Sequence, residues 1–382
     1  MSKPVMQLVL DDPTLATYHS SIQARYERYQ RLKAQLAASE GSFQDFAKGY
    51  ERFGLHRTSV GLLFKEWAPG AVAMCIYGDF NEWKRWQFNA TKDEYGIWTI
   101  LLPLTLDRLP SHNERYKLIL RLGNGKEVDR IPAWASHVRQ NTVSRLFDCV
   151  FWDPPVPYEW KHEAPKAPTG LKIYECHVGM CSEYPVVASF ADFRINVLPR
   201  IAETGYNAIQ LMAIMEHAYY ASFGYHVTNF FAASSRYGTP DDLKALVDEA
   251  HRLGLVVLMD LVHSHASSNV LDGINQFDGT DHHYFHEGVK GRHKLWDSRL
   301  FNYDHWEVLR FLLSNVAWWM KEYKFDGFRF DGVTSMLYVH HGIGVAFSGK
   351  YHEYFHHCDD AAVTYLMLAN DLIHEINPVL ST

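Results

Sequence analysis

The residues Phe325–Val333, which read Phe-Asp-Gly-Phe-Arg-Phe-Asp-Gly-Val, form the stretch that most constrains how this chain folds. Their aromatic and apolar side chains predict a β-strand, in which side chains two residues apart point the same way. Phe328 and Phe330 therefore share one face of the strand, while Arg329 and Asp331 share the other. Such a strand presents an apolar face to a core and ends in a charged pair.

Asp331 closes this predicted strand directly before Gly332, which allows the backbone to turn sharply. Arg329 lies on the same face, and a neighbouring cation keeps a carboxylate ionised. An ionised carboxylate at a strand end that opens into a cleft is what a glycosidic nucleophile requires. The alternative is a structural arginine–aspartate pair, because ion-pair networks also occur outside active sites.

The rest of the second half, residues 171–382, alternates between strand and helix patterns. The candidates are strands at Leu171–His177, Ala208–Met212, Leu255–Val262 and Phe325–Asp331, and helices at Phe190–Thr204, Pro240–Leu253, Trp306–Lys321 and Asp359–Ile376. This alternation predicts a parallel sheet with right-handed crossovers. Long loops after the second and third strands favour a (β/α)8 barrel with its site at the carboxyl ends of the strands, and a doubly wound sheet is the alternative.

Four βα units are found before Thr382 where a complete barrel needs eight. We therefore expect the first half of a (β/α)8 barrel, and we expect these 382 residues to be part of a longer enzyme.

Three other regions precede the predicted half barrel. Residues 1–45 predict a helical segment, in which Asp12 and Pro13 start a helix with one apolar stripe. Residues 46–151 carry short strand patterns separated by turn signals, which predict a β-sandwich. These patterns lie at Leu62–Trp67, Val72–Tyr77, Gly96–Leu102 and Tyr116–Leu120. Five prolines in residues 152–170 indicate a stiff linker.

Two residues of the predicted sandwich are candidates for sugar binding. Trp83 lies on a turn, where an exposed indole can stack on a sugar ring, and Lys117 on a later strand can donate to sugar hydroxyls. A tryptophan folded back onto the sandwich is the alternative for Trp83.

The overall composition excludes several classes of partner. The net charge of −7 and the pI of about 6.3 give no electrostatic reason to expect nucleic acid or acidic lipid. No apolar run approaches a membrane span, and residues 1–12 lack the pattern of a signal peptide. Five cysteines without a Cys-x-x-Cys motif indicate reduced thiols, so we expect a cytoplasmic protein.

Further polar residues follow the other predicted strands. Asp260 closes the third strand and His265 lies in the loop beyond it, so both would reach the mouth that Asp331 occupies. A neutral His265 could donate to sugar hydroxyls while Asp260 aligns a neighbouring side chain. A zinc pair of His263 and His265 is the alternative, although no third ligand with convincing spacing is present. Tyr225, in the loop after the second strand, suits the floor of a sugar subsite or simple loop packing.

These stretches resemble the eukaryotic-type glycogen (1,4-α-glucan) branching enzymes of the α-amylase superfamily. The motifs that carry the resemblance are Glu175-Cys-His-Val-Gly, Gln210-Leu-Met-Ala-Ile-Met-Glu-His, Ser222-Phe-Gly-Tyr-His, Asp260-Leu-Val-His-Ser-His, Leu295-Trp-Asp-Ser-Arg-Leu-Phe and Phe325-Asp-Gly-Phe-Arg-Phe-Asp-Gly. The stretches Lys65-Glu-Trp-Ala-Pro-Gly and Gly78-Asp-Phe-Asn resemble the carbohydrate-binding sandwich that precedes the barrel in that family.

The resemblance implies roles for individual residues. It makes Asp331 the nucleophile and Arg329 the residue that keeps it ionised. It implies sugar contacts for Tyr225, Asp260 and His265 at the cleavage subsite, for Trp83 and Lys117 on the sandwich, and for Glu307 and Arg310 at the start of the third barrel helix. No cofactor or metal is implied, the polymer would be glycogen or another α-1,4-glucan, and the full-length enzyme would be a monomer.

The implied reaction is a retaining double displacement that turns α-1,4 linkages into α-1,6 branches. It needs a second carboxyl group as acid/base, about 5–5.5 Å from the nucleophile. The family carries this glutamate at the end of the fifth strand, and that position is not among these residues. An α-glucan hydrolase or debranching enzyme, and a glucan-binding protein without turnover, are the two alternatives.

Overall fold

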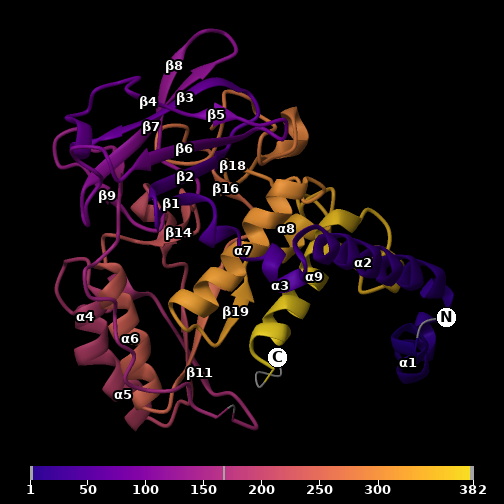
Figure 1. Ribbon diagram of the computed structural model, residues 1–382. Helices are drawn as coiled ribbons and strands as arrows, with labels where there is room; N and C mark the ends of the chain where they lie inside the picture. The colour runs from indigo at the N-terminus through magenta and orange to yellow at the C-terminus, as the bar shows by residue number, and fades with distance from the viewer. Residues whose placement is uncertain (1–2, 167, 379–382) are drawn as a thin grey trace.

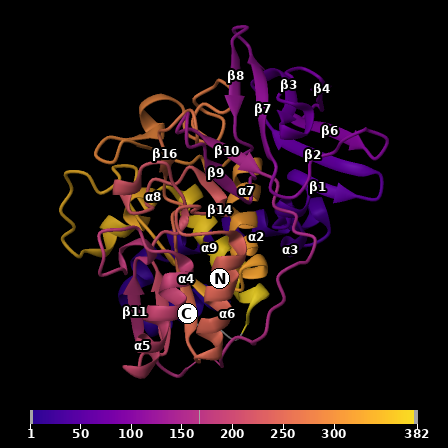
Figure 2. The same ribbon diagram turned by 90° about the vertical axis from the view of Figure 1, so that its left-hand side faces the viewer.

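The computed structural model describes residues 3–166 and 168–378. It contains a helical segment at the N-terminus, a β-sandwich and a four-stranded parallel sheet with helices (Figure 1, Figure 2). In Figure 1 the sandwich lies at the top, the parallel strands lie below it, and the N-terminal helices lie to one side. The expected fold class, an N-terminal helix, a β-sandwich and then the first half of a (β/α)8 barrel, is confirmed.

The N-terminal segment contains three helices, α1 (Lys3–Asp11), α2 (His19–Glu40) and α3 (Phe43–Phe46). Asp12 accepts a hydrogen bond from the Thr14 N–H at 3.0 Å, but it caps a 3₁₀ turn, Pro13–Tyr18, and the long helix begins only at His19. The apolar stripe of α2 docks on the last helix, α9 (Asp360–Ile376), as the spacing predicted. Tyr29 and Lys33 of α2 both bond Asp371 of α9.

The sandwich consists of two antiparallel sheets, with the strand orders β1-β2-β6-β5 and β4-β3-β7-β10-β9, and with β8 paired to β7. The strands are β1 Gly54–Thr58, β2 Gly61–Trp67, β3 Ala71–Gly78, β4 Phe88–Asn89, β5 Thr91–Lys92, β6 Ile97–Pro103, β7 Arg115–Leu122, β8 Glu127–Arg130, β9 Val138–Gln140 and β10 Phe147–Val150. The four predicted strands correspond to β2, β3, β6 and β7. The strands that sequence patterns missed have five residues or fewer, too few to show a clear alternation.

The parallel sheet has the order β11-β12-β15-β19, which is the order of the strands along the chain. The strands are β11 Ile173–Cys176, β12 Ala208–Leu211, β15 Val256–Leu261 and β19 Gly327–Phe330, and the helices are α4 Phe190–Asp192, α5 Leu198–Glu203, α6 Pro240–Arg252, α7 Trp306–Glu322 and α8 Val333–Leu337. A doubly wound sheet reverses its strand order part-way, so this sequential order favours the barrel.

The loops of the half barrel contain further short strands. They are β13 Met215–Glu216 and β14 Asn229–Ala233 after β12, and β16 Ala266–Ser267, β17 Arg292–His293 and β18 Ser298–Arg299 after β15. They belong to the long loops that sequence analysis placed on one rim.

The predicted helix Phe190–Thr204 is interrupted by a π-helical turn at Phe193–Val197, between α4 and α5. Pro199 explains the interruption, because proline has no N–H to donate to the carbonyl four residues earlier. The prediction of one continuous helix was therefore wrong at this turn.

The described part of the proline-rich linker, residues 152–166 and 168–170, forms no helix or strand. It is anchored to α6 through Asp248, whose carboxylate accepts the N–H groups of Lys161 and His162 at 3.2 and 2.9 Å. The Tyr158 hydroxyl donates to the same carboxylate at 3.1 Å. The linker therefore lies along the half barrel.

Trp134 joins the sandwich to the half barrel. Its indole is stacked between Phe53 and Phe231, with ring centroids 4.9 and 4.7 Å away, and Phe311 of α7 contacts it edge-on. Gly49 leaves room for this ring, because a Cβ atom there would lie 2.7 Å from Trp134. Aromatic contacts of this kind stabilise beyond the area that they bury.

Glu66 of β2 holds the backbone beside this tryptophan. Its fully buried carboxylate accepts the N–H of Ala133 at 2.8 Å and the N–H of Trp67 at 3.1 Å. Burial disfavours the charged form and outweighs these two hydrogen bonds, so the pKa of Glu66 is raised to about 8.

Glu66 makes the stability of this region depend on pH. A raised folded-state pKa means that its stabilising contribution is complete below the unfolded pKa, near 4.5, and is lost as the pH rises towards 8. We expect Glu66→Gln, which cannot ionise, to gain about 3–5 kcal/mol relative to the wild type between pH 5 and pH 9. Denaturant unfolding at each pH measures this difference, and parallel curves for the two proteins would contradict it. Glu94→Gln, at an exposed turn, is the control.

Candidate active site

A row of polar side chains crosses the parallel sheet near the carboxyl ends of its strands. Gln210 of β12 donates through Nε2 to Glu175 of β11 at 3.2 Å and to Asp260 of β15 at 2.7 Å. Arg329 of β19 donates through Nη1 to Asp260 at 3.0 Å and to Asp331 at 2.6 Å. We call these five residues the polar ladder.

Strand register creates the polar ladder. Glu175 is paired with Gln210 across β11 and β12, and Asp260 is paired with Arg329 across β15 and β19. Sequence analysis identified Asp260, Arg329 and Asp331 but gave no role to Glu175 or Gln210. Gln210 could have been identified from the sequence, because it is the single amide side chain in the otherwise apolar strand Ala208–Leu211.

Asp260 is the most heavily hydrogen-bonded member of the polar ladder. The Tyr225 hydroxyl donates to its Oδ2 at 2.6 Å, in addition to the bonds from Gln210 and Arg329. Burial raises the pKa of Asp260, although the three donors act in the opposite direction. Burial also lowers the pKa of Arg329, but Asp260 and Asp331 outweigh it and raise that pKa above its usual value.

Asp331 is held differently from Asp260. Arg329 binds its Oδ1, and its Oδ2 has no hydrogen-bond partner among the residues that the structure describes. Its side chain keeps about a fifth of its surface exposed, at 19%. The sequence pattern predicted this pairing with Arg329 across two residues of one strand face. A carboxylate that is fixed through one oxygen, partly exposed and without a described partner on the other oxygen suits a nucleophile.

His265 lies behind Tyr225. Its Nε2 is 2.8 Å from the Tyr225 carbonyl oxygen, which can only accept, so Nε2 carries the hydrogen. Its Nδ1 then accepts from the Ser264 hydroxyl at 3.0 Å, and burial lowers the pKa of the ring to about 4. His265 is therefore neutral and positions Tyr225, while its predicted contact with a sugar hydroxyl stays a prediction.

His263 takes no part in this arrangement. Its ring nitrogens bond Asn315 at 2.9 Å and the Tyr365 hydroxyl at 2.5 Å, inside the core. Because both rings already have two partners, His263 and His265 do not form the zinc pair considered from sequence.

The structure does not bring Glu307 and Arg310 to the polar ladder. Arg310 donates to Glu307 at 2.9 Å and to Glu40 of α2 at 2.8 Å, and its guanidinium lies over the Phe46 ring. Arg52 also donates to Glu40, at 2.6 Å. This network fastens α7 to the N-terminal helices, and the substrate contact implied for Glu307 and Arg310 stays a prediction.

Trp83 and Lys117 lie on the outer face of the sandwich. Tyr77 connects them, since it is paired with Lys117 across β3 and β7 and contacts the Trp83 ring edge-on at 5.4 Å. The Trp83 indole is half-buried and donates to Asp79 at 2.8 Å, while Lys117 forms an ion pair with Asp148 at 3.0 Å. The indole is thus partly folded back, and its sugar contact stays a prediction.

Two family models match parts of the chain. Residues 52–135 match carbohydrate-binding module 48 (isoamylase N-terminal domain), and residues 195–284 match the alpha amylase catalytic domain. The "1,4-alpha-glucan-branching enzyme" of Rhizophagus irregularis is 54% identical over 97% of this chain, and that of Equus caballus is 54% identical over 96%. The chain is thus similar to 1,4-alpha-glucan-branching enzymes over nearly its whole length.

A plant protein shows the same similarity. The "1,4-alpha-glucan-branching enzyme 2-2, chloroplastic/amyloplastic" of Arabidopsis thaliana is 55% identical over 96% of this chain. The chain spans about half the length of these curated relatives, namely 55%, 53% and 46% of the three proteins.

Solved structures show the same fold at low sequence identity. The group B Streptococcus pullulanase SAP in complex with maltotetraose is 20% identical, with a TM-score of 0.66, and the match covers 86% of this chain and 45% of that one. The pullulanase of Paenibacillus barengoltzii is 19% identical, with a TM-score of 0.61, over 75% and 49% of the two chains.

Gly332, which follows Asp331, has little room for an added methyl group. It has a φ of +65°, and a Cβ atom there would lie 2.6 Å from Ser264 Oγ, the partner of His265. We expect Gly332→Ala to cost about 1–2 kcal/mol for the left-handed backbone and about 1–3 kcal/mol for the crowding.

Gly254→Ala is the matched control, because Gly254 has a φ of +76° and open space around it. Denaturant unfolding of both variants separates the two costs. Equal destabilisation of the two variants would show that Ser264 moves away freely.

Proposed function

We propose that this chain supplies the glucan-binding module and the nucleophile of a glycogen-branching transglycosylase. The observation that carries the proposal is the Asp331 carboxylate directly after β19, which Arg329 binds through one oxygen while the side chain stays 19% exposed. The sequence similarity to branching enzymes supports the reaction class.

In the proposed reaction, Asp331 attacks the anomeric carbon of an α-1,4 linkage from the side opposite the leaving oxygen. The glycosidic bond breaks, the leaving oxygen receives a proton from an acid/base group, and a covalent glycosyl–aspartate forms. The 6-hydroxyl of an acceptor chain then attacks the same carbon and loses its own proton to the acid/base group, which is protonated again. The products are a free Asp331 and an α-1,6 branch.

Asp260 is not the acid/base group in this proposal. Tyr225, Gln210 and Arg329 occupy both of its oxygens, so it aligns Tyr225 and Arg329 and has no free oxygen to exchange protons with a leaving group. General acid catalysis is worth about 10²–10⁴-fold. The chain spans about half the length of its relatives. We therefore propose that the acid/base glutamate lies in the part of the relatives' length that this chain does not cover.

The proposal also covers the partner, the oligomeric state and the location of the enzyme. The partner is glycogen or a similar α-1,4-glucan, and the full-length enzyme acts as a monomer in glycogen biosynthesis. All five cysteines are free thiols, which supports a cytoplasmic location. No helix among the described residues is long and apolar enough to cross a membrane.

Asp331→Asn should abolish branching by the native full-length protein, because the neutral amide cannot form the glycosyl intermediate. We expect a loss of at least about 10⁴-fold, the scale at which essential catalytic groups act. The fall in iodine staining of amylose, with linkage analysis of the product, measures it. Asp107→Asn, at an exposed loop of the sandwich, should retain full activity.

The outcome of that assay also separates the alternatives. New reducing ends without α-1,6 linkages would mean that the enzyme is a hydrolase. Glycogen binding without any turnover, by the wild type and Asp331→Asn alike, would mean a binding protein.

Trp83→Ala should weaken the affinity of the chain for glycogen by about 2–12-fold, the worth of one aromatic contact of about 0.5–1.5 kcal/mol. Co-sedimentation with glycogen measures it. Tyr184→Ala, which removes a ring that is 70% exposed on the half barrel, is the control. Equal affinities for Trp83→Ala and the wild type would remove Trp83 from the binding face.

A further inference from the structure

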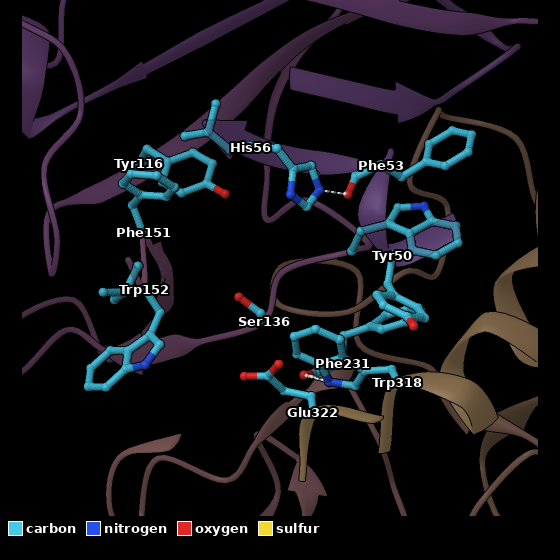
Figure 3. A pocket seen from close by; sticks show the side chains of 14 residues that line it. Tyr50, Phe53, His56, Tyr116, Ser136, Phe151, Trp152, Phe231, Trp318 and Glu322 are labelled. Carbon is cyan, nitrogen blue, oxygen red and sulfur yellow. Dashed lines mark hydrogen bonds between the residues drawn. The ribbon is translucent and has the colours of Figure 1, made fainter. Parts of the chain in front are cut away.

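A cavity of about 240 Å³ lies where the sandwich meets the half barrel (Figure 3). Its walls come from β1, β7 and β10 on one side and from β14 and α7 on the other. None of the residues that line it belongs to the polar ladder, or to the Trp83 face of the sandwich. It is therefore separate from both sites described above.

Aromatic rings form much of the cavity wall, and other contacts hold them in place. Trp318 donates its indole N–H to the Phe231 carbonyl at 2.9 Å, and the Tyr50 ring lies 5.5 Å from the Trp318 ring. On the opposite side, the Trp152 ring is contacted edge-on by His112 at 4.7 Å. Rings on both sides of an opening are the walls that the apolar faces of a sugar ring require.

Three polar groups besides the tyrosine hydroxyls, from three different segments, face the same space (Figure 3). His56 Nε2 lies 2.7 Å from the Phe53 carbonyl oxygen, to which it must donate, so His56 Nδ1 is an acceptor. The Ser136 hydroxyl points into the cavity and has no hydrogen-bond partner among the residues that the structure describes.

Glu322 is the last of the three polar groups that face the cavity. Lys244 bonds its Oε1, so the charge of this carboxylate is already matched, while its Oε2 has no partner in the described part of the chain. Tyr50 and Tyr116 also line the cavity and carry hydroxyl groups. A cavity with two acceptors, several hydroxyls and no unmatched charge favours a neutral ligand with hydroxyl groups over an amine or a phosphate.

The size of the cavity limits the ligand further. Pockets for drug-sized ligands measure about 300–1,000 Å³, so a cavity of about 240 Å³ accommodates one sugar ring with its substituents. A glucan has one such unit that a closed pocket can take, namely the residue at a chain end.

We propose that this cavity binds one terminal glucose unit of an α-glucan, as a second site remote from Asp331. His56, Ser136 and Glu322 bond the sugar hydroxyls, and Tyr50, Trp152 and Trp318 surround the ring. The proposal rests on the proposed function for its choice of α-glucan. Such a site would anchor a chain end while another part of the polymer reaches the polar ladder.

The test is a titration of the native full-length protein with glucose, maltose and maltotriose, followed by calorimetry and by tryptophan fluorescence. We use the Trp83→Ala background, so that the sandwich face contributes little. We expect one saturable site that depends on the residues of the cavity. Ser136→Phe should abolish it by filling the cavity, and Ser136→Ala should weaken it by about 2–10-fold, the worth of one hydrogen bond.

Ser144→Phe, on an exposed loop of the sandwich, controls for the added ring and should bind like the parent. If Ser136→Phe fails to fold, Ser136→Ala and Glu322→Gln carry the test, and both should bind less tightly. Unchanged affinity in these variants, or no saturable binding of any of the three sugars, would overturn the proposal. Asp331→Asn should bind the sugars normally, so a failure here leaves the proposed chemistry at Asp331 untouched.

Discussion

One nitrogen of Arg329 donates to both Asp260 and Asp331, and this shared bond joins the third and fourth parallel strands at the rim of the half barrel. A single cation between two carboxylates balances repulsion that would otherwise push them apart. Tyr225 and Gln210 then bond Asp260, and His265 holds Tyr225 from behind. The geometry around the candidate nucleophile therefore depends on Arg329, and an arginine-to-lysine change would not be conservative here.

The contact between the sandwich and the half barrel depends on aromatic packing and on a buried carboxylate. Trp134 is stacked between rings of both units, and the buried carboxylate of Glu66 fixes the backbone beside it. Flat rings leave spaces where they meet at angles, and the cavity lined by Trp134, Tyr50 and Trp318 is one such space. These contacts hold the sandwich against the half barrel, so they fix the direction of Trp83 and Lys117 relative to Asp331.

Much of this arrangement could be predicted from sequence. Long periodic segments, such as α6, α7 and the strand that leads to Asp331, were placed within a few residues, because burial imposes a clear repeat on them. The two-residue strands, the π turn before Pro199 and the late start of α2 were not, because local hydrogen bonds decide them and leave no period to detect. Glu307 and Arg310 lie in a network with Glu40, a partner 270 residues from Arg310 in the chain, which no local pattern predicts.

The sequence by itself determined which residues are candidates for the chemistry. Alternation on one strand puts Arg329 and Asp331 on the same face, and positions at or after predicted strand ends make Asp260, His265 and Tyr225 candidates. Only the tertiary structure decided how they are connected, since the register between strands places Arg329 opposite Asp260 and brings Gln210 into the same row. It also decided that His265 bonds the backbone of Tyr225 and that a cavity lies between the sandwich and the half barrel. Those outcomes depend on distances between segments far apart in the chain, which local spacing does not encode.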